Sequence, residues 1–381
     1  RIKKNSAYSV TVKTQPSNPT QTCSVHNGSG TVSKNNVTNV IVSCTQAGRF
    51  AYVANQLSNN LSAYAIDSAS GDLFPINGSP FAVSGTTPVS VTVDPNGQFL
   101  YVVNSGSDDV SVFAIDYSTG TLTAAGIPAR TGSAPEAAVV DPTDTYLYVA
   151  NLAANSVSAY TINSSTGTLT ELSNSPFAAG AAPSSLKIDP GGNFLYVTDF
   201  TGGNVTALVI DSATGSLSTV SGSPFAAGAG ALSIAIDPSG TYVYVGNETA
   251  ATISEYSINA STGALTPISG SPLTTGSSPE SLAVAPAGQF LYAANVTAKN
   301  QVTAYSIASS GGALTLSGSP TGSGIFPVSI ALDPSGQWAY VANDNSNDIS
   351  VYAVDATTGV LTQASHSPFA AGNQPRSIAI D

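Results

Sequence analysis

Histidine, the side chain that titrates nearest neutral pH, is scarce in this chain. There are two, His26 and His366. His366 begins a His-Ser-Pro-Phe segment where other parts of the chain read Gly-Ser-Pro-Phe. These segments recur in an internal repeat, described below, where they follow the outermost strand, so we expect His366 on the periphery of the fold. We expect His26 beside a hairpin turn. Neither is expected to serve as a general acid or base.

Two glutamates and an arginine share a more informative position. They occupy one column at the start of seven similar segments: Val89, Glu136, Ser184, Leu232, Glu280, Val328 and Arg376. If these segments surround one axis, Glu136, Glu280 and Arg376 lie on one rim, which is also where neighbouring loops would open. Those loops would bring further charges to it: Asp108, Asp109, Glu248, Lys299, Asp344 and Asp348.

Three interpretations of this rim stay open. The one we favour is a set of solvated loop charges. The second is a cation or polar-ligand site, because Asp344 and Asp348, with Asn345 and Asn347, offer oxygen ligands suited to Ca²⁺, although the spacing of an EF-hand is missing. The third is an acid–base site that uses Glu136 or Glu280 with Arg376. No cofactor is expected unless the calcium interpretation holds.

The two cysteines lie outside the repeats, at Cys23 and Cys44. A Cys-x-x-Cys or Cys/His metal spacing is absent, and the segment that holds them is too small for a large core. We therefore predict a disulfide, which favours an exported protein. The alternative is a pair of reduced, buried thiols.

The elements that must position the rim are defined by an internal repeat. The motif aromatic-x-Tyr-Val-x-Asn, with small variations, recurs at intervals of 47 to 49 residues. Each period contains four short β-prone runs, separated by Asp-Pro-x-Gly turns and by Asx-to-Gly turns. Four antiparallel strands at this period are typical of a propeller blade. The tyrosines of the motif are Tyr52, Tyr101, Tyr148, Tyr196, Tyr244, Tyr292 and Tyr340.

We therefore predict an all-β, seven-bladed propeller over residues 46–381, with four-stranded antiparallel blades. The first blade lacks its innermost strand, and Arg376–Asp381 matches the missing piece. The final strand should pair beside Arg49–Asn55 and close the ring, leaving no open edge.

Residues 1–45 do not follow the repeat. Ser6–Lys13 and Val37–Cys44 read as strands, and Asn27-Gly28-Ser29-Gly30 reads as a turn. So few strands predict part of a β-sandwich module, whose open edge could join copies into a homo-oligomer or filament by strand addition.

Composition excludes some partners. Charged residues make up 8% of the 381 residues against an ordinary share of about 25%, and the net charge is −12. There is no basic stripe for nucleic acid and no apolar run of about 18 residues for a membrane span. An uncharged polar surface together with the cysteine pair favours an extracellular or cell-surface location.

The chain resembles the lactonase-like, YVTN-type seven-bladed propellers. The resemblance rests on the Tyr-Val-x-Asn repeats, the Asp-Pro-x-Gly turns and the Gly-Ser-Pro-Phe links, and it covers Gly48 to Asp381. This group includes 6-phosphogluconolactonases and many secreted repeat proteins. It implies a His, Glu and Arg constellation on one mouth, from which this chain departs because its propeller histidine is elsewhere. The first segment resembles Cys-closed β-modules that precede such propellers.

From an intact repeat and few catalytic groups we expect an exported, non-enzymatic scaffold or binding module. Its partner would be a protein or glycan at the rim, and residues 1–45 would mediate self-assembly. The alternative is a lactonase-type hydrolase similar to 6-phosphogluconolactonase. A second alternative is a carbohydrate-binding propeller.

Overall fold

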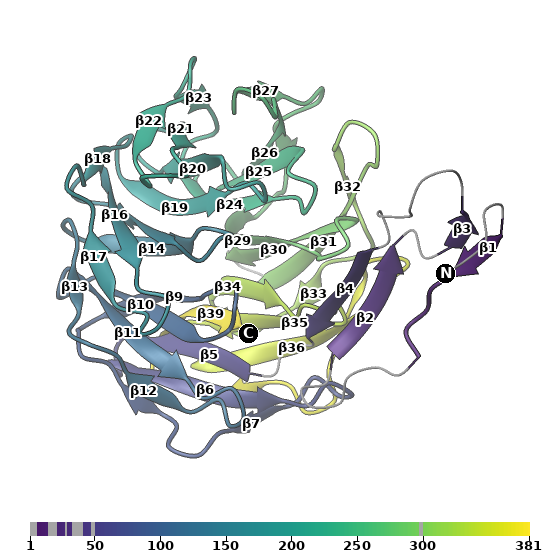
Figure 1. Cartoon of the computed structure of the whole chain (residues 1–381), viewed down its shortest axis with the longest axis horizontal. Helices are drawn as coiled ribbons and strands as arrows, with labels where there is room; N and C mark the ends of the chain where they lie inside the picture. Colours follow the sequence, from purple (N-terminus) through teal and green to yellow (C-terminus); the bar gives the residue numbers. More distant parts are fainter. Residues whose placement is uncertain (1–5, 14–20, 27–28, 33–40, 47–49, 297–299) are drawn as a thin grey trace.

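The computed structural model describes residues 6–13, 21–26, 29–32, 41–46, 50–296 and 300–381. All regular elements in these ranges are strands, and seven similar sheets stand around one axis (Figure 1). None of the described residues forms a helix that is long and apolar enough to span a membrane.

Each sheet has the same order from the axis outward. The innermost strands are β39 (Pro375–Ile380), β9 (Pro88–Val93), β14 (Pro135–Val140), β19 (Pro183–Ile188), β24 (Ala231–Ile236), β29 (Ser278–Val284) and β34 (Pro327–Leu332). The second strands, which carry the repeated motif, are β5 (Phe50–Asn55), β10 (Phe99–Asn104), β15 (Tyr146–Asn151), β20 (Phe194–Asp199), β25 (Tyr242–Asn247), β30 (Phe290–Val296) and β35 (Trp338–Asn343).

Two further strands complete the four-stranded blade. The third strands are β6 (Asn60–Ile66), β11 (Asp109–Ile115), β16 (Ser156–Ile162), β21 (Asn204–Ile210), β26 (Thr252–Ile258), β31 (Gln301–Ile307) and β36 (Asp348–Val354). The fourth are β7 (Leu73–Pro75), β12 (Leu122–Ala124), β17 (Leu169–Glu171), β22 (Leu217–Thr219), β27 (Leu265–Pro267), β32 (Leu314–Leu316) and β37 (Leu361–Gln363).

A short fifth strand, not predicted from the sequence, also pairs with the third strand of every blade. These strands are β8 (Phe81–Ala82), β13 (Ala129–Arg130), β18 (Phe177–Ala178), β23 (Phe225–Ala226), β28 (Leu273–Thr274), β33 (Thr321–Gly322) and β38 (Phe369–Ala370). The predicted all-β, seven-bladed fold is confirmed.

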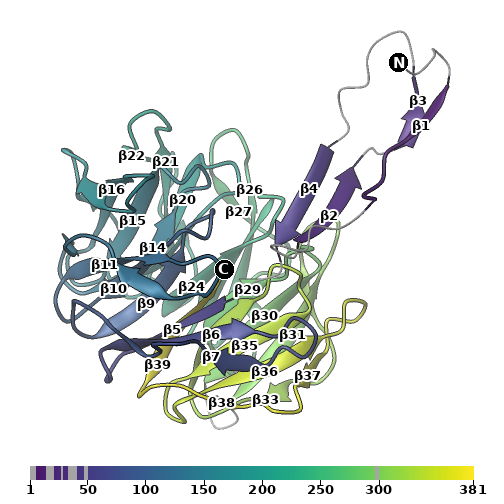
Figure 2. The ribbon, with the colours of Figure 1, turned by 60° about the horizontal axis from the view of Figure 1, so that its bottom comes forward.

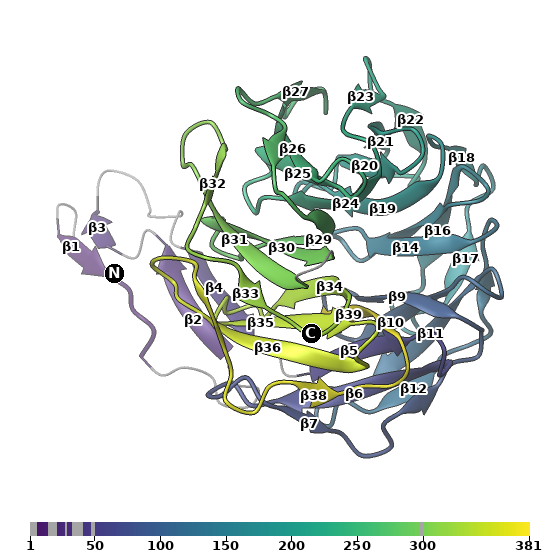
Figure 3. The same ribbon diagram turned by 180° about the vertical axis from the view of Figure 1, so that it is seen from behind.

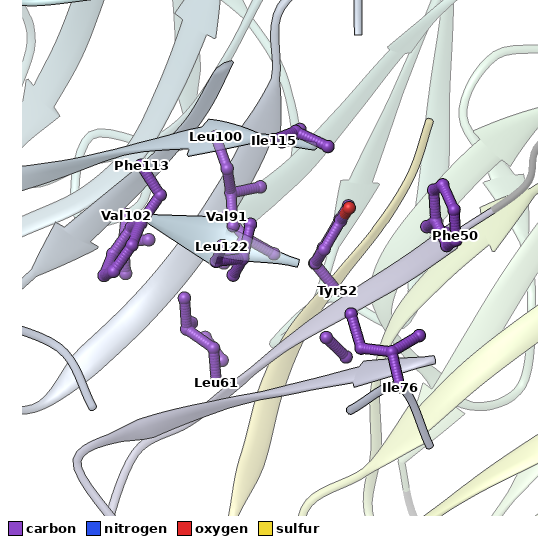
Figure 4. Close-up of a cluster of buried hydrophobic side chains, with 12 residues drawn as sticks. Phe50, Tyr52, Leu61, Ile76, Val91, Leu100, Val102, Phe113, Ile115 and Leu122 are labelled. Atoms are coloured by element: carbon purple, nitrogen blue, oxygen red, sulfur yellow. The ribbon is translucent and has the colours of Figure 1, made fainter. Parts of the chain in front are cut away.

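The aromatic pair of the motif joins each blade to the next. In the first blade the Tyr52 hydroxyl donates to the Gly120 carbonyl at 3.0 Å, and the Phe50 ring lies where a Cβ on Gly120 would stand. Gly120 has a φ of +71°, so this turn favours glycine on conformational grounds as well. Tyr52 is fully buried, and burial of a side chain of this kind contributes roughly 1.5–3 kcal/mol. The interblade layer is therefore the hydrophobic core (Figure 4).

The asparagine of the motif has a different task, within its own blade. The Asn104 amide donates to Asp109 Oδ1 at 2.8 Å and to Ser111 Oγ at 2.9 Å, both on the third strand. Asn343 bonds Asp348 and Ser350 in the same way. The motif is thus explained by packing between blades and by hydrogen bonds within them.

The ring closes as predicted. β39 pairs antiparallel with β5, although more than 300 residues separate them in the sequence. Asp381 Oδ1 accepts a hydrogen bond from the Phe50 amide at 2.9 Å, as the turn residue Asp94 does from Phe99 within one blade. The innermost strands then contact one another in an unbroken circle (Figure 3).

The first segment forms two small sheets beside the ring (Figure 2). β1 (Ala7–Ser9) pairs with β3 (Ser29–Thr31), and β2 (Gln21–His26) pairs with β4 (Ile41–Gln46). The register places Cys23 opposite Cys44, so the backbones suit the predicted disulfide, which stays a prediction. The predicted turn residues Asn27 and Gly28, and residues 37–40 of the predicted second strand, lie outside the described ranges.

Candidate functional site

A β-bulge occurs at the same place in all seven blades. In the third blade Pro135 pairs with Asn151 and Ala137 with Ala150, so Glu136 is the extra residue. A bulge turns a side chain away from the regular alternation of a strand and is common beside active sites. The seven extra residues are Val89, Glu136, Ser184, Leu232, Glu280, Val328 and Arg376. They define the rim, the mouth of the ring where the innermost strands begin.

The order of strands around the axis sets the spacing of the charged rim residues. Along the circle of contacts, β9 separates β39 from β14 on one side, and β34 separates β39 from β29 on the other. Glu136 and Glu280 are therefore each two blades from Arg376, in opposite directions. All three side chains are half-buried.

Arg376 acts on both glutamates. Burial raises the pKa of Glu136, whereas the positive charge of Arg376 and a hydrogen bond with Ser105 lower it. Burial raises the pKa of Glu280 to about 7, with a further rise from Glu248 and an opposing effect of Arg376. At neutral pH the Glu280 carboxyl is therefore close to half ionised, the condition that suits a general base. The acid–base interpretation of the rim stays a prediction, and Glu280 is the group whose raised pKa favours it.

Asp344 also faces this arginine. It lies in the loop after β35 and is 6% exposed. Burial raises the pKa of Asp344 and Arg376 lowers it. Its Oδ1 atom is buried and has no hydrogen-bond partner in the described structure. The arginine is thus shared by three carboxyl groups.

The other carboxyl groups predicted for the rim have hydrogen-bond partners. Asp108 Oδ1 accepts a hydrogen bond from the Ala134 amide at 2.7 Å, which ties one blade to the next. Asp109 and Asp348 each accept a hydrogen bond from the motif asparagine of their own blade. Lys299 lies outside the described ranges.

The described ranges hold no group of three or more His, Cys, Asp or Glu side chains arranged around a metal position. Asp348 and Asp344 also differ in their surroundings, because Asp348 bonds Asn343 whereas Asp344 is acted on by Arg376. The calcium interpretation stays a prediction.

His366 lies on the periphery, as expected. Its side chain is 70% exposed, and Nδ1 is 2.8 Å from Asp72 Oδ2 in the first blade. The contact joins the last repeat to the first, far from the rim. The side chain of His26 lies outside the described part of the structure.

The fold and the rim together define a closed seven-bladed propeller that carries carboxyl groups and one arginine at the mouth of its channel. A family model described as "Lactonase, 7-bladed beta-propeller" matches residues 7–135, 44–183, 125–232 and 181–378. The chain therefore belongs to this lactonase family. No curated protein matches it in sequence.

Several solved structures share the fold. A protein of Bacteroides uniformis, provisionally assigned as a 6-phosphogluconolactonase, is 19% identical with a TM-score of 0.78, covering 88% of this chain and 100% of its own. A similarly assigned protein of Bacteroides fragilis is 20% identical with a TM-score of 0.76, covering 87% and 97%. The periplasmic gluconolactonase PpgL of Pseudomonas aeruginosa is 18% identical with a TM-score of 0.75, covering 87% and 98%.

The expectation of a non-enzymatic scaffold is wrong. The family match and the similar structures support its stated alternative, a lactonase-type propeller. The error came from the assumption that a propeller without a histidine at its rim has no group for acid–base catalysis. A partly buried glutamate near an arginine can supply the proton transfer that a histidine supplies elsewhere. Location, partners and self-assembly stay predictions.

Proposed function

We propose that the protein hydrolyses the lactone of a sugar acid at the rim. The observation that carries the proposal is the bulge position that half-buried Glu280 shares with Arg376 on one rim. Burial and Glu248 raise the pKa of Glu280 to about 7, and Arg376 opposes the rise. A base of this pKa combines a useful ionised fraction at neutral pH with good proton affinity.

The reaction needs a base, a stabilised oxyanion and an acid. In the proposed sequence the Glu280 carboxylate takes a proton from water while the water oxygen bonds to the lactone carbonyl carbon. Arg376 stabilises the negative charge that forms on the carbonyl oxygen. The bond between the carbonyl carbon and the ring oxygen then breaks, and the protonated Glu280 returns its proton to the ring oxygen. One lactone and one water give one hydroxy acid.

Glu136 is proposed as a positioning residue. Burial raises its pKa, whereas Arg376 and a hydrogen bond with Ser105 oppose the rise. Both effects favour the carboxylate, whose charge in turn attracts the guanidinium. Val89 and Val328, the bulge residues of the blades on either side, offer Arg376 no competing charge.

The charge of the rim argues for an unphosphorylated substrate. Glu136, Glu280 and Asp344 are all acted on by Arg376, and Glu248 lies near Glu280. A phosphate group would bring about two more negative charges to these carboxyl groups at neutral pH. We therefore propose a neutral aldonolactone such as glucono-1,5-lactone.

A pH-stat assay with glucono-1,5-lactone tests the proposal. We expect turnover above the spontaneous rate, with kcat/KM rising as the pH rises through about 7 because the ionised Glu280 is the base. Glu280→Gln should lower kcat by about 10²- to 10⁴-fold, and Arg376→Gln by about 10²- to 10³-fold. The 6-phosphorylated lactone should be the poorer substrate.

Matched controls are available on the outer parts of the ring. Glu171→Gln changes an exposed glutamate on β17, and Arg130→Gln changes an exposed arginine on β13. Both should leave kcat unchanged. Wild-type protein that binds the sugar lactone without hydrolysing it would replace this proposal with the carbohydrate-binding alternative, and activity that survives Glu280→Gln would remove Glu280 as the base.

A further inference from the structure

The channel holds a second charged position, at the end opposite the rim. One column of the innermost strands pairs with the motif tyrosines, and its other members are uncharged. The column is Thr92, Val139, Lys187, Ala235, Ala283, Ala331 and Ala379. Lys187 is the only charged residue in it.

The alanines of this column leave space around the axis. A cavity of about 440 Å³ is lined by the ends of β9, β19, β24, β29, β34 and β39, with Lys187 in its wall. Its size falls in the range of small-molecule sites. The lining residues are mostly aliphatic, and those that stay partly exposed include Val93, Val284, Leu332 and Ile380.

Lys187 has no counter-ion among the residues that the structure describes, where no hydrogen bond or ion pair involves its amine. Its side chain is exposed to the channel, but the protein that surrounds it displaces part of its solvent and so lowers its pKa. The nearest acidic residues in the sequence and in the cavity wall are Asp189 and Asp237, and both carboxylates are occupied. Asp189 accepts from the Asn193, Phe194 and Gly191 amides. Asp237 accepts from the Thr241 and Tyr242 amides and from Ser239.

We propose that this cavity binds a small organic carboxylate with a short aliphatic body. The carboxylate would bond the Lys187 ammonium, and the hydrocarbon would lie against the aliphatic wall. The ammonium and the aliphatic residues together favour this class over inorganic phosphate, which has no hydrocarbon to cover the apolar part of the wall. The site is separate from the lactone site, because Lys187 precedes the Asp-Pro turn at the far end of β19.

Isothermal titration with hexanoate tests the proposal. We expect binding to the wild-type protein, with an affinity about 10- to 100-fold weaker in Lys187→Ala, the loss of one charge-assisted hydrogen bond. The substitution restores the residue found at four other positions of the column. Hexan-1-ol and hexylammonium, which keep the chain without the carboxylate, should bind far more weakly than hexanoate. Inorganic phosphate should also bind weakly.

Two further variants separate this site from the rim. Glu280→Gln and Arg376→Gln should bind hexanoate as the wild-type protein does, whatever their effect on lactone hydrolysis. Equal hexanoate affinity in wild type and Lys187→Ala, or no binding to either, overturns the proposal. Phosphate binding as tight as that of hexanoate would contradict the assigned ligand class.

An NMR titration of the wild-type protein tests the proposal without a variant that could misfold. Reductive methylation with ¹³C-formaldehyde gives each lysine an NMR signal whose pH titration can be followed in the wild-type protein. The pKa of Lys187 should lie below the ordinary lysine value, because the surrounding protein removes part of the solvent that stabilises its charge, and hexanoate should raise that pKa. A Lys187 signal unmoved by hexanoate would contradict the proposal even if hexanoate binds.

Discussion

Single residues that depart from the repeat carry most of the interest in this protein. Glu136, Glu280 and Arg376 replace apolar or small residues at the bulge, and Lys187 replaces alanine in the channel. Asp144 is another departure, because it occupies a turn position that is glycine in Gly97 and four other blades. Because the repeat occurs seven times, each of these residues can be compared with the residues at the equivalent position of the other blades.

Asp144 places a second carboxylate beside Asp94 of the neighbouring blade. Asp94 is 3% exposed, and its Oδ2 atom has no hydrogen-bond partner in the described structure. Burial first, and then the negative charge of Asp144, raise the pKa of Asp94 to about 6. Asp144 also has a φ of +57°, a left-handed conformation that glycine adopts at lower cost than aspartate.

We predict that Asp144→Gly stabilises the protein, and more so at pH 8 than at pH 5. Because the pKa of Asp94 is raised in the folded state, Asp94 contributes stability at low pH that is lost as the pH rises through about 6. Removal of the negative charge of Asp144 should therefore stabilise the protein mainly above that pH. The gain should be roughly 1 kcal/mol at pH 8, measured by urea unfolding. Asn96→Ala, which removes only a hydrogen bond to Asp144, should keep the original pH dependence. An equal gain at both pH values would show that backbone strain alone is responsible.

At the scale of the element, the blade interface tolerates one buried charge. Glu255 lies on β26 opposite Tyr244, where the other third strands carry alanine or valine. It is 3% exposed, and the one hydrogen bond given to its side chain in the described structure comes from the Leu314 amide, 3.4 Å from Oε2. Burial raises the pKa of Glu255, and the Leu314 amide partly offsets the rise.

Glu255→Val should therefore raise the free energy of unfolding at pH 8, by about 1–3 kcal/mol for removal of a poorly satisfied buried polar group. The benefit should shrink toward pH 4, because a raised folded pKa means that the native state is favoured when Glu255 is protonated. Thermal unfolding at the two pH values measures the difference. Glu255→Gln, which keeps the shape and removes the charge, should reproduce the pH effect. A Tm that falls at pH 8 in both variants would contradict this account.

The serines of the innermost strands show how the elements are held together at the axis. Ser377 Oγ accepts the Val91 amide of the next blade at 3.1 Å, and Ser329 Oγ accepts the Ile378 amide at 3.2 Å. Ser233 Oγ, at the equivalent position, has no hydrogen-bond partner in the described structure, but Ser281 Oγ accepts the Ile330 amide at 3.2 Å, so three of these serines join neighbouring innermost strands. This explains a repeated hydroxyl without any catalytic role.

At the scale of the whole molecule, ring closure and the proposed site depend on one strand. β39 supplies both the pairing with β5 and the only arginine of the rim column. Glu136 and Glu280 reach Arg376 from opposite sides because the circle is complete. Loss of the closing strand would therefore leave two buried glutamates without their cation.

The sequence predicted the fold better than the site. Seven copies of Phe50–Asn55 at one period determined the blade number, and the match of residues 376–381 to a missing strand predicted closure. The rim column was also recognised from its spacing. The bulge that aims Glu136 and Glu280 at the channel mouth was not, because it depends on a register shift between strands. Burial of Glu280, which sets its pKa, is likewise a property of the assembled ring.

The central claim, that Arg376 and Glu280 form one electrostatic unit at the rim, is tested most directly by NMR titration of the side chains. The chain has only five glutamates, so ¹³C-glutamate labelling gives a simple spectrum. We predict that the Glu280 carboxyl titrates near pH 7 and that Arg376→Gln raises the pKa values of both Glu280 and Glu136, because a positive charge that favours their ionised forms is removed. Arg130→Gln should change neither. A Glu280 that titrates at the ordinary value of 4.5, unmoved by Arg376→Gln, would contradict the claim.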